Sequence, residues 1–119
     1  MDFNADKPIY LQITDYVCEQ ILLGHWEPNE PIPSVRELAV NLSVNPNTVI
    51  RSYAWLEEMG VISMQRGLGY FVSATGLALV FEIKKEAFVK NELPKLFRQM
   101  DLLKIDVKQL MKFYKARQL

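Results

Sequence analysis

The chain has 119 residues, half of them hydrophobic, and its 14 basic and 14 acidic side chains give a net charge of zero. This length accommodates one compact domain, or a small domain with an appendage, but no second large ligand-binding domain, and no apolar run approaches the roughly 20 residues that span a membrane. The acidic segment at residues 1–6 lacks the features of a secretion signal, and the single cysteine, Cys18, cannot form an internal disulfide, so we expect a cytoplasmic protein without a membrane partner.

The first predicted element is a helix over residues 9–23. Pro8 suits its first position, because the missing N–H of proline costs nothing there. Apolar residues at intervals of four form one inward stripe: Ile9, Ile13, Val17 and Ile21. Gly24 ends the helix, and the three prolines of residues 25–33 predict an extended loop with turns.

Two further helices follow, joined by a brief turn. Ser34 and Glu37 form a capping box that begins a helix over residues 35–42. Asn45 is an N-cap and Pro46 the first helical residue of the next helix, which ends at Gly60. This arrangement is the helix-turn-helix pattern.

The third helix has a polar outward face. Val49, Tyr53 and Leu56 point inward by spacing, which leaves Asn47, Arg51 and the edge of Ser52 outside. Asparagine can pair with adenine and arginine with guanine, each contributing about 1–3 kcal/mol of base discrimination. The capped helix starts at Ser34 and Asn45 also offer backbone amides to phosphates. The alternative is that Ser34 and Asn45 are only caps and Arg51 is a solvated surface residue.

Residues 61–65 and 70–73 favour β-strands, and the two glycines of residues 66–69 predict a hairpin turn between them. A hairpin directly after a helix-turn-helix is a wing. Arg66 at its tip could enter a narrow minor groove, although Arg-Gly is also an ordinary hairpin turn.

The segment after Gly76 is predicted to be a helical tail. Pro94 predicts a kink or restart near residues 91–93, and residues 106–109 open a last helix. The large apolar residues are too many for so short a segment to bury by itself, so we expect a second copy of the chain to cover them. The lysines of the tail are interpreted as the solvated side of these helices, and the alternative is that they make a second contact with DNA.

The predicted fold is mainly α with a small β-hairpin: a winged helix-turn-helix DNA-binding domain over residues 1–75 and a helical dimerisation tail over residues 76–119. The first part holds four basic and nine acidic residues, a net charge of −5, so the tail is +5. An acidic domain must bind DNA through a few placed arginines. If Arg36, Arg51 and Arg66 of both subunits of a dimer meet phosphates, a plot of log affinity against log salt concentration should have a slope of about −5. This is the steepest slope that these six arginines would produce.

Several short motifs, in order and in register, resemble the GntR family of bacterial transcription regulators. They are Pro8–Ile13, Pro33–Ala39, Val44–Val49, Leu56–Ile62 and Arg66–Val72. The short helical tail is similar to that of the YtrA-like subfamily. This resemblance implies a homodimer that binds double-stranded DNA, dimerises through its C-terminal helices and regulates genes that often encode transporters.

The resemblance also implies roles for particular residues. Arg36 matches a DNA-contacting arginine, Thr48 a threonine of the recognition helix, and Gly67 the wing-tip glycine that lets the backbone approach the minor groove. Asn45 and Asn47 occupy neighbouring contact positions. The chain departs from many relatives at two positions, where Pro46 and Ile50 replace arginines.

The main expectation is therefore a sequence-specific repressor of a small operon, and the alternative is a winged-helix module that binds protein instead of DNA. The chain contains no acid–base pair or phosphate-binding glycine loop that would favour an enzyme. Cys18 is interpreted as a small core residue and His25 as a surface residue; together they cannot form a usual zinc site. We expect no cofactor and no metal, and the sequence identifies no small-molecule effector.

Overall fold

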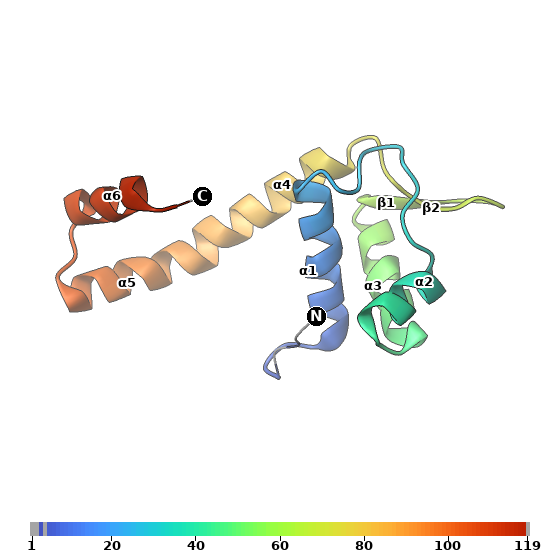
Figure 1. The fold of residues 1–119 in the computed structure, drawn as a ribbon, viewed down its shortest axis with the longest axis horizontal. Coiled ribbons are helices and arrows are strands. Elements are labelled where there is room, and N and C mark those ends of the chain that lie inside the picture. Colours follow the sequence, from blue (N-terminus) through green and yellow to red (C-terminus); the bar gives the residue numbers. More distant parts are fainter. Residues whose placement is uncertain (1–2, 4, 119) are drawn as a thin grey trace. The chain divides into compact units, whose positions relative to one another are not determined.

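The structure, a computed structural model, describes residue 3 and residues 5–118. Met1, Asp2 and Asn4, which belong to the acidic segment considered above, lie outside the described residues, as does Leu119. In chain order the elements are α1 (Ile9–Leu22), α2 (Val35–Leu42), α3 (Pro46–Glu58), β1 (Ile62–Gln65), β2 (Gly69–Val72), α4 (Gly76–Ala87), the π-helical turn η1 (Phe88–Glu92), α5 (Leu93–Leu103) and α6 (Val107–Ala116) (Figure 1). None of the helices among these residues has the length and apolar character needed to cross a membrane.

The chain forms two compact units, residues 1–82 and 83–119. The first contains α1 to α3, the hairpin and the start of α4, and this is the winged helix-turn-helix expected from the sequence. The predicted boundary at residues 75 and 76 coincides with the beginning of α4. The assignment of separate DNA-binding and dimerisation roles on its two sides stays a prediction.

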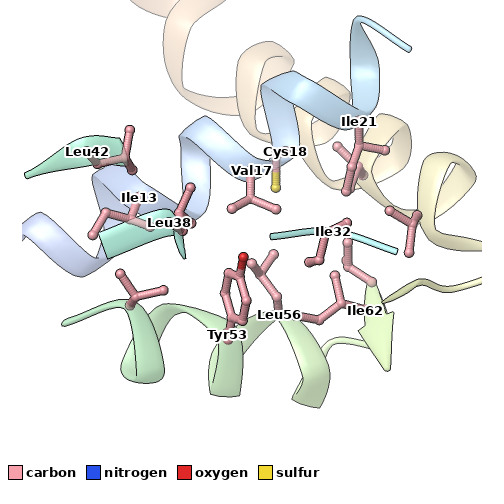
Figure 2. Packing of buried hydrophobic residues seen from close by; sticks show 14 of the residues in the cluster. Ile13, Val17, Cys18, Ile21, Ile32, Leu38, Leu42, Tyr53, Leu56 and Ile62 are labelled. Carbon is pink, nitrogen blue, oxygen red and sulfur yellow. The ribbon is translucent and has the colours of Figure 1, made fainter. Parts of the chain in front are cut away.

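The core of the first unit lies between α1, α2 and α3. Figure 2 shows Ile13 and Val17 of α1 facing Tyr53 and Leu56 of α3, with Leu38 of α2 beside them. All five side chains are at most 1% exposed. Burying each large apolar side chain contributes about 1.5–3 kcal/mol, so this cluster holds the three helices together. Cys18 lies within it, as expected.

Two expectations about α1 are wrong in detail. Pro8 occupies the N-cap position and not the first helical position, with an extended ψ of 138°. Ile9 is 46% exposed, so the buried stripe begins at Ile13.

The outward placement of Ser52 is also wrong. Ser52 is fully buried, and its hydroxyl is hydrogen-bonded to the hydroxyl of Thr14 on α1, 2.7 Å away. The Thr14 hydroxyl in turn donates to the Tyr10 carbonyl at 2.8 Å. A buried hydroxyl needs such a partner, and only the packing of α1 on α3 supplies it.

The hairpin pairs β1 with β2 antiparallel, with Ile62 opposite Val72 and Gln65 opposite Gly69. The proline-rich loop before α2 adds a further edge to this sheet. The Ile32 amide donates to the Tyr70 carbonyl at 3.0 Å, and the Val72 amide donates to the Glu30 carbonyl at 3.1 Å. Strand β2 is therefore hydrogen-bonded on both sides, to β1 and to the loop.

Helix α4 begins in close contact with the sheet. A Cβ at Gly76 would lie 2.7 Å from the Val61 carbonyl oxygen and 2.8 Å from a Val72 methyl group, which explains why glycine occupies the first position. One turn later Val80 is 1% exposed in the same core. The first unit therefore needs the start of α4 to complete its packing.

In the second unit, the predicted restart at residues 91–93 is a π-helical turn. Residues 88–92 widen the helix just before Pro94, whose ring and missing N–H an ordinary α-helical ladder cannot accept. Helix α6 begins within residues 106–109, as predicted, and the structure adds a capping box of Asp106 and Gln109. Among the described residues of this unit, Met100 is the one apolar side chain with less than a tenth of its surface exposed.

Candidate nucleic-acid interface

The outward face of α3 is the centre of the candidate interface. Val49, Ser52, Tyr53 and Leu56 are buried, so the helix presents its opposite side to solvent. Asn47, Ile50 and Arg51 are exposed on that side, and Thr48 at its edge is half-buried. The face combines an amide, a branched apolar group and a cation, which suits contacts with base edges in a major groove.

The first turn of α3 is closed by its own cap. The Asn45 side chain accepts the Asn47 amide at 2.8 Å, the Asn45 carbonyl accepts the Thr48 amide at 3.0 Å, and Pro46 has no amide hydrogen. The expectation that this helix start offers free amides to a phosphate is therefore wrong. The side chains of Asn45, Asn47 and Thr48 remain available as candidate contacts.

The start of α2 offers what α3 lacks. Its capping box is complete, with the Glu37 amide donating to Ser34 Oγ and the Ser34 amide donating to Glu37 Oε1, both at 3.1 Å. The Ser34 backbone amide, followed by the Ser34 hydroxyl, holds the pKa of Glu37 below its ordinary value. The box engages neither the Val35 nor the Arg36 amide, and the exposed Arg36 side chain follows at the same helix end. A positive helix end with an arginine suits a phosphate.

Arg36 also lies between two shallow hollows of about 350 Å³ each. One is lined by α2 and the start of α3, including Val40, Val44 and Pro46. The other lies between the start of α2 and the wing and includes Ser34 and Leu68. The structure thus brings the predicted α2 residues beside both the recognition helix and the wing.

The wing tip is exposed and tightly turned. The Leu68 amide donates to the Gln65 carbonyl at 2.9 Å, and Gly67 has a φ of +78°, a conformation that favours glycine. A Cβ at Gly67 would contact nothing within 4 Å, so the glycine serves the turn and leaves its surroundings open. Arg66 is exposed beside it.

Tyr53 connects α3 to the start of α2 and to the wing. The sequence predicted only that Tyr53 points into the core. Its hydroxyl donates to the Pro33 carbonyl at 2.7 Å, just before α2, and its ring packs edge-on against Tyr70 of the wing with centroids 4.9 Å apart. Burial raises the pKa of Tyr53, so the hydroxyl keeps its proton and remains a donor. One side chain of α3 therefore fixes the start of α2 and the wing.

Tyr10 is a second contributor that sequence reasoning missed. The Arg51 guanidinium carbon lies 3.9 Å from the centroid of the Tyr10 ring, in the first turn of α1. A contact between residues 41 positions apart in the chain has no local pattern by which it could be found.

Other reactive groups do not gather into a site. Cys18 is 4% exposed in the core, and His25 is exposed and hydrogen-bonded to the Gln20 side chain at 2.8 Å. Among the described residues no three histidine, cysteine or acidic side chains are grouped as metal ligands would be.

Comparison with known proteins gives this geometry a context. The family model "Bacterial regulatory proteins, gntR family" matches residues 9–72, which include the helix-turn-helix and the wing. The HTH-type transcriptional repressor YtrA of Bacillus subtilis is 33% identical over 115 residues, covering 97% of this chain and 88% of that protein.

Solved structures agree with the sequence comparison. A GntR family transcriptional regulator from Listeria monocytogenes has a TM-score of 0.80 and 32% identity, covering 98% of this chain and all of that one. The DNA-binding domain of AraR in complex with operator ORR3 has a TM-score of 0.55 and 26% identity, covering 61% of this chain and 86% of that one. The similarity therefore extends to a domain whose structure contains operator DNA.

Proposed function

This chain belongs to the GntR family of bacterial regulatory proteins, and we propose that it binds a specific operator as a homodimer and represses a small operon. It is a transcription regulator of a DNA-binding family, similar along nearly its whole length to a repressor, and its homologues are regulators and not enzymes. The single observation that carries the proposal is the exposed polar face of α3 on a winged helix-turn-helix. The YtrA-like resemblance extends the proposal to transporter genes as targets, and to action in the bacterial cytoplasm.

We assign base reading to α3. Asn47 and Arg51 are exposed on its outward face, where adenine and guanine edges would pair with an amide and a guanidinium. Asn45 and Thr48 flank them at the helix start. This face is polar at its centre, which favours DNA over the alternative of an apolar protein partner.

We assign backbone contacts to α2 and the wing. Ser34 and Arg36 lie at the open start of α2, where a phosphate would meet amides and a guanidinium. Arg66 and Gly67 form the exposed tip of the wing, which would approach the minor groove. In this proposal the four residues set the orientation of α3 on the duplex and contribute most of the salt dependence.

We assign dimerisation to residues 76–119. The large apolar side chains that are exposed in the second unit are Phe88, Val89, Leu96, Phe97, Leu102, Leu103, Val107, Met111, Phe113 and Tyr114. Contiguous apolar surface on this scale is typical of an interface, and the same surface on a second copy is the simplest complement. Two linked winged helices would then meet the two halves of a palindromic operator.

The proposal is tested by selecting duplex DNA from a random pool with the full chain and measuring binding to the enriched sequence by gel shift. We expect one enriched palindromic sequence, to which Arg51→Ala binds at least tenfold more weakly. The matched control is Arg98→Ala, which removes an exposed arginine of α5 and should bind like the wild type. Failure to enrich any sequence, or equal losses in both variants, would contradict the proposed mode of binding. Reporter expression with and without the protein distinguishes repression from activation.

A further inference from the structure

The contact between Arg51 and Tyr10 connects the recognition helix to a helix outside the helix-turn-helix. The guanidinium carbon lies 3.9 Å from the ring centroid, well within the distance of a cation–π contact. Arg51 is the only basic residue of α3. The ring of Tyr10 therefore contacts the single cation of this helix.

Tyr10 is itself held in place. Its side chain is half-buried, and its backbone carbonyl lies 2.8 Å from the Thr14 hydroxyl, which is in turn 2.7 Å from the Ser52 hydroxyl. Ser52 is the residue next to Arg51, and both Thr14 and Ser52 are buried. The helix turn that carries the ring is thus tied to the turn of α3 that carries the guanidinium.

Such a contact has a physical advantage for recognition. A free arginine side chain loses about 2 kcal/mol of rotamer entropy when it is fixed, and stacking fixes part of it before DNA arrives. A guanidinium whose face lies on a ring keeps its N–H donors available in its plane, and these donors pair bidentately with guanine. Among the described residues Arg51 forms no ion pair that would compete for them.

We propose that Tyr10 is a positioning residue for DNA recognition, whose ring holds the Arg51 guanidinium so that its edge reads a guanine. This inference rests on the proposed function. It predicts that the aromatic ring matters to DNA binding only while Arg51 is present, whereas the tyrosine hydroxyl does not matter.

The test is a double-mutant cycle in the full chain, using the duplex that the wild-type protein enriches from a random pool. Affinity is measured for Tyr10→Leu, Tyr10→Phe and Arg51→Ala, and for each Tyr10 variant combined with Arg51→Ala. Tyr16→Leu, alone and with Arg51→Ala, is the control, because Tyr16 is a half-buried aromatic residue of the same helix that packs on Trp26. Thermal melts report the folded fraction of each variant.

We expect Tyr10→Leu to weaken binding by about two- to thirtyfold, the range of a cation–π contact, and Tyr10→Phe to bind within about twofold of the wild type. In the Arg51→Ala background, Tyr10→Leu should cause no further loss of affinity. The preference for guanine at one operator position should be lost both in Tyr10→Leu alone and in Arg51→Ala alone. Tyr16→Leu should add its effect independently of Arg51.

A loss from Tyr10→Leu that is equal with and without Arg51 would overturn the positioning role, since it would then be a general effect on stability. Unchanged binding by Tyr10→Leu would overturn it as well. If Tyr10→Leu does not fold, an unaltered guanine preference in a Tyr10→Met variant overturns it. If no sequence is enriched at all, the proposed function fails together with the inference, whereas enrichment with additive losses defeats the inference alone.

Discussion

The two units of the chain differ in how far they bury their large apolar side chains. In residues 1–82 the large apolar groups of three helices and a hairpin close around one core. In residues 83–118 comparable side chains remain exposed, with Leu102 at 74% and Met100 as the buried exception. Yet helices in both units begin with a complete capping box. Good local helix structure therefore does not imply that a segment can bury its own surface.

The units also differ in charge. Residues 1–82 hold four basic and ten acidic residues, and residues 83–119 hold ten basic and four acidic ones, giving −6 and +6. General attraction to DNA would be expected from the second unit, but the recognition fold is in the first. A negatively charged DNA-binding unit must depend on a few well-placed cationic contacts, such as those of Arg36 and Arg51.

The largest effect is expected from adding a charge to the exposed apolar surface of the tail. Phe97→Glu should convert a dimer into a monomer in sedimentation at micromolar concentration, because an interface that buries residue 97 would bury an unpaired carboxylate. Loss of the second winged helix should lower operator affinity by about 10²- to 10⁴-fold. Gln99→Glu, an exposed polar position of the same helix, is the control. A wild-type protein that sediments as a monomer would contradict the proposal that a second copy of the chain covers the exposed apolar surface of the tail.

The same truncation should have different consequences in the two units. Leu56→Ala removes a fully buried side chain and should lower the free energy of unfolding by about 2–5 kcal/mol. Leu102→Ala removes an exposed one and should change it by less than about 0.5 kcal/mol in the monomer. Thermal melts across protein concentrations sharpen the comparison, since an effect of Leu102→Ala that appears only at high concentration assigns residue 102 to the dimer.

A smaller effect, on the salt dependence of DNA affinity, is expected from adding a cation to α3. Ile50 is 52% exposed on the outward face of α3. Ile50→Arg adds two cations to a dimer and should steepen the dependence of log affinity on log salt by about 2. Ile50→Gln, polar but uncharged, should leave the slope unchanged. Equal slopes for both variants would mean that residue 50 does not approach the phosphates.

The smallest effect is a pH dependence at the start of α2. Hydrogen bonds from Ser34 lower the pKa of Glu37 in the folded state, so its ionised form stabilises the fold above the unfolded pKa, and that contribution disappears as pH falls through the folded pKa. Carbon-detected NMR should find the Glu37 pKa below that of a free glutamate. Ser34→Ala removes the hydroxyl but keeps the backbone amide, so the pKa should move only part of the way up towards the ordinary value. An unchanged Glu37 pKa would exclude the Ser34 hydroxyl as a cause.

Much of the fold could be predicted because its rules are local. The caps at Ser34 and Asn45 were identified from residue type and spacing, and each forms the expected hydrogen bond. The two glycines between the strands predicted the hairpin in the same way. The family motifs added the order of these elements, and the comparisons confirm that resemblance.

The errors occur where two distant segments meet. Spacing placed Ser52 at the edge of the outward face, but Thr14 supplies a buried partner that holds it inside. The capped start of α3 appeared open to phosphate until the use of its amides was known. These outcomes depend on which other helix lies alongside, and one helix pattern contains no information about that.

By itself, the sequence determined where helices begin, which stripe of α3 turns inward, where the wing turns, and which family the chain belongs to, because caps, glycines and apolar periodicity act within a few residues. The tertiary structure alone decided that Tyr53 joins α2 to the wing, that the proline-rich loop becomes a sheet edge, and that the Tyr10 ring contacts Arg51. These contacts join residues 17 or more positions apart. Because the geometry of these contacts depends on how whole helices and strands pack, no local sequence pattern predicted the contacts.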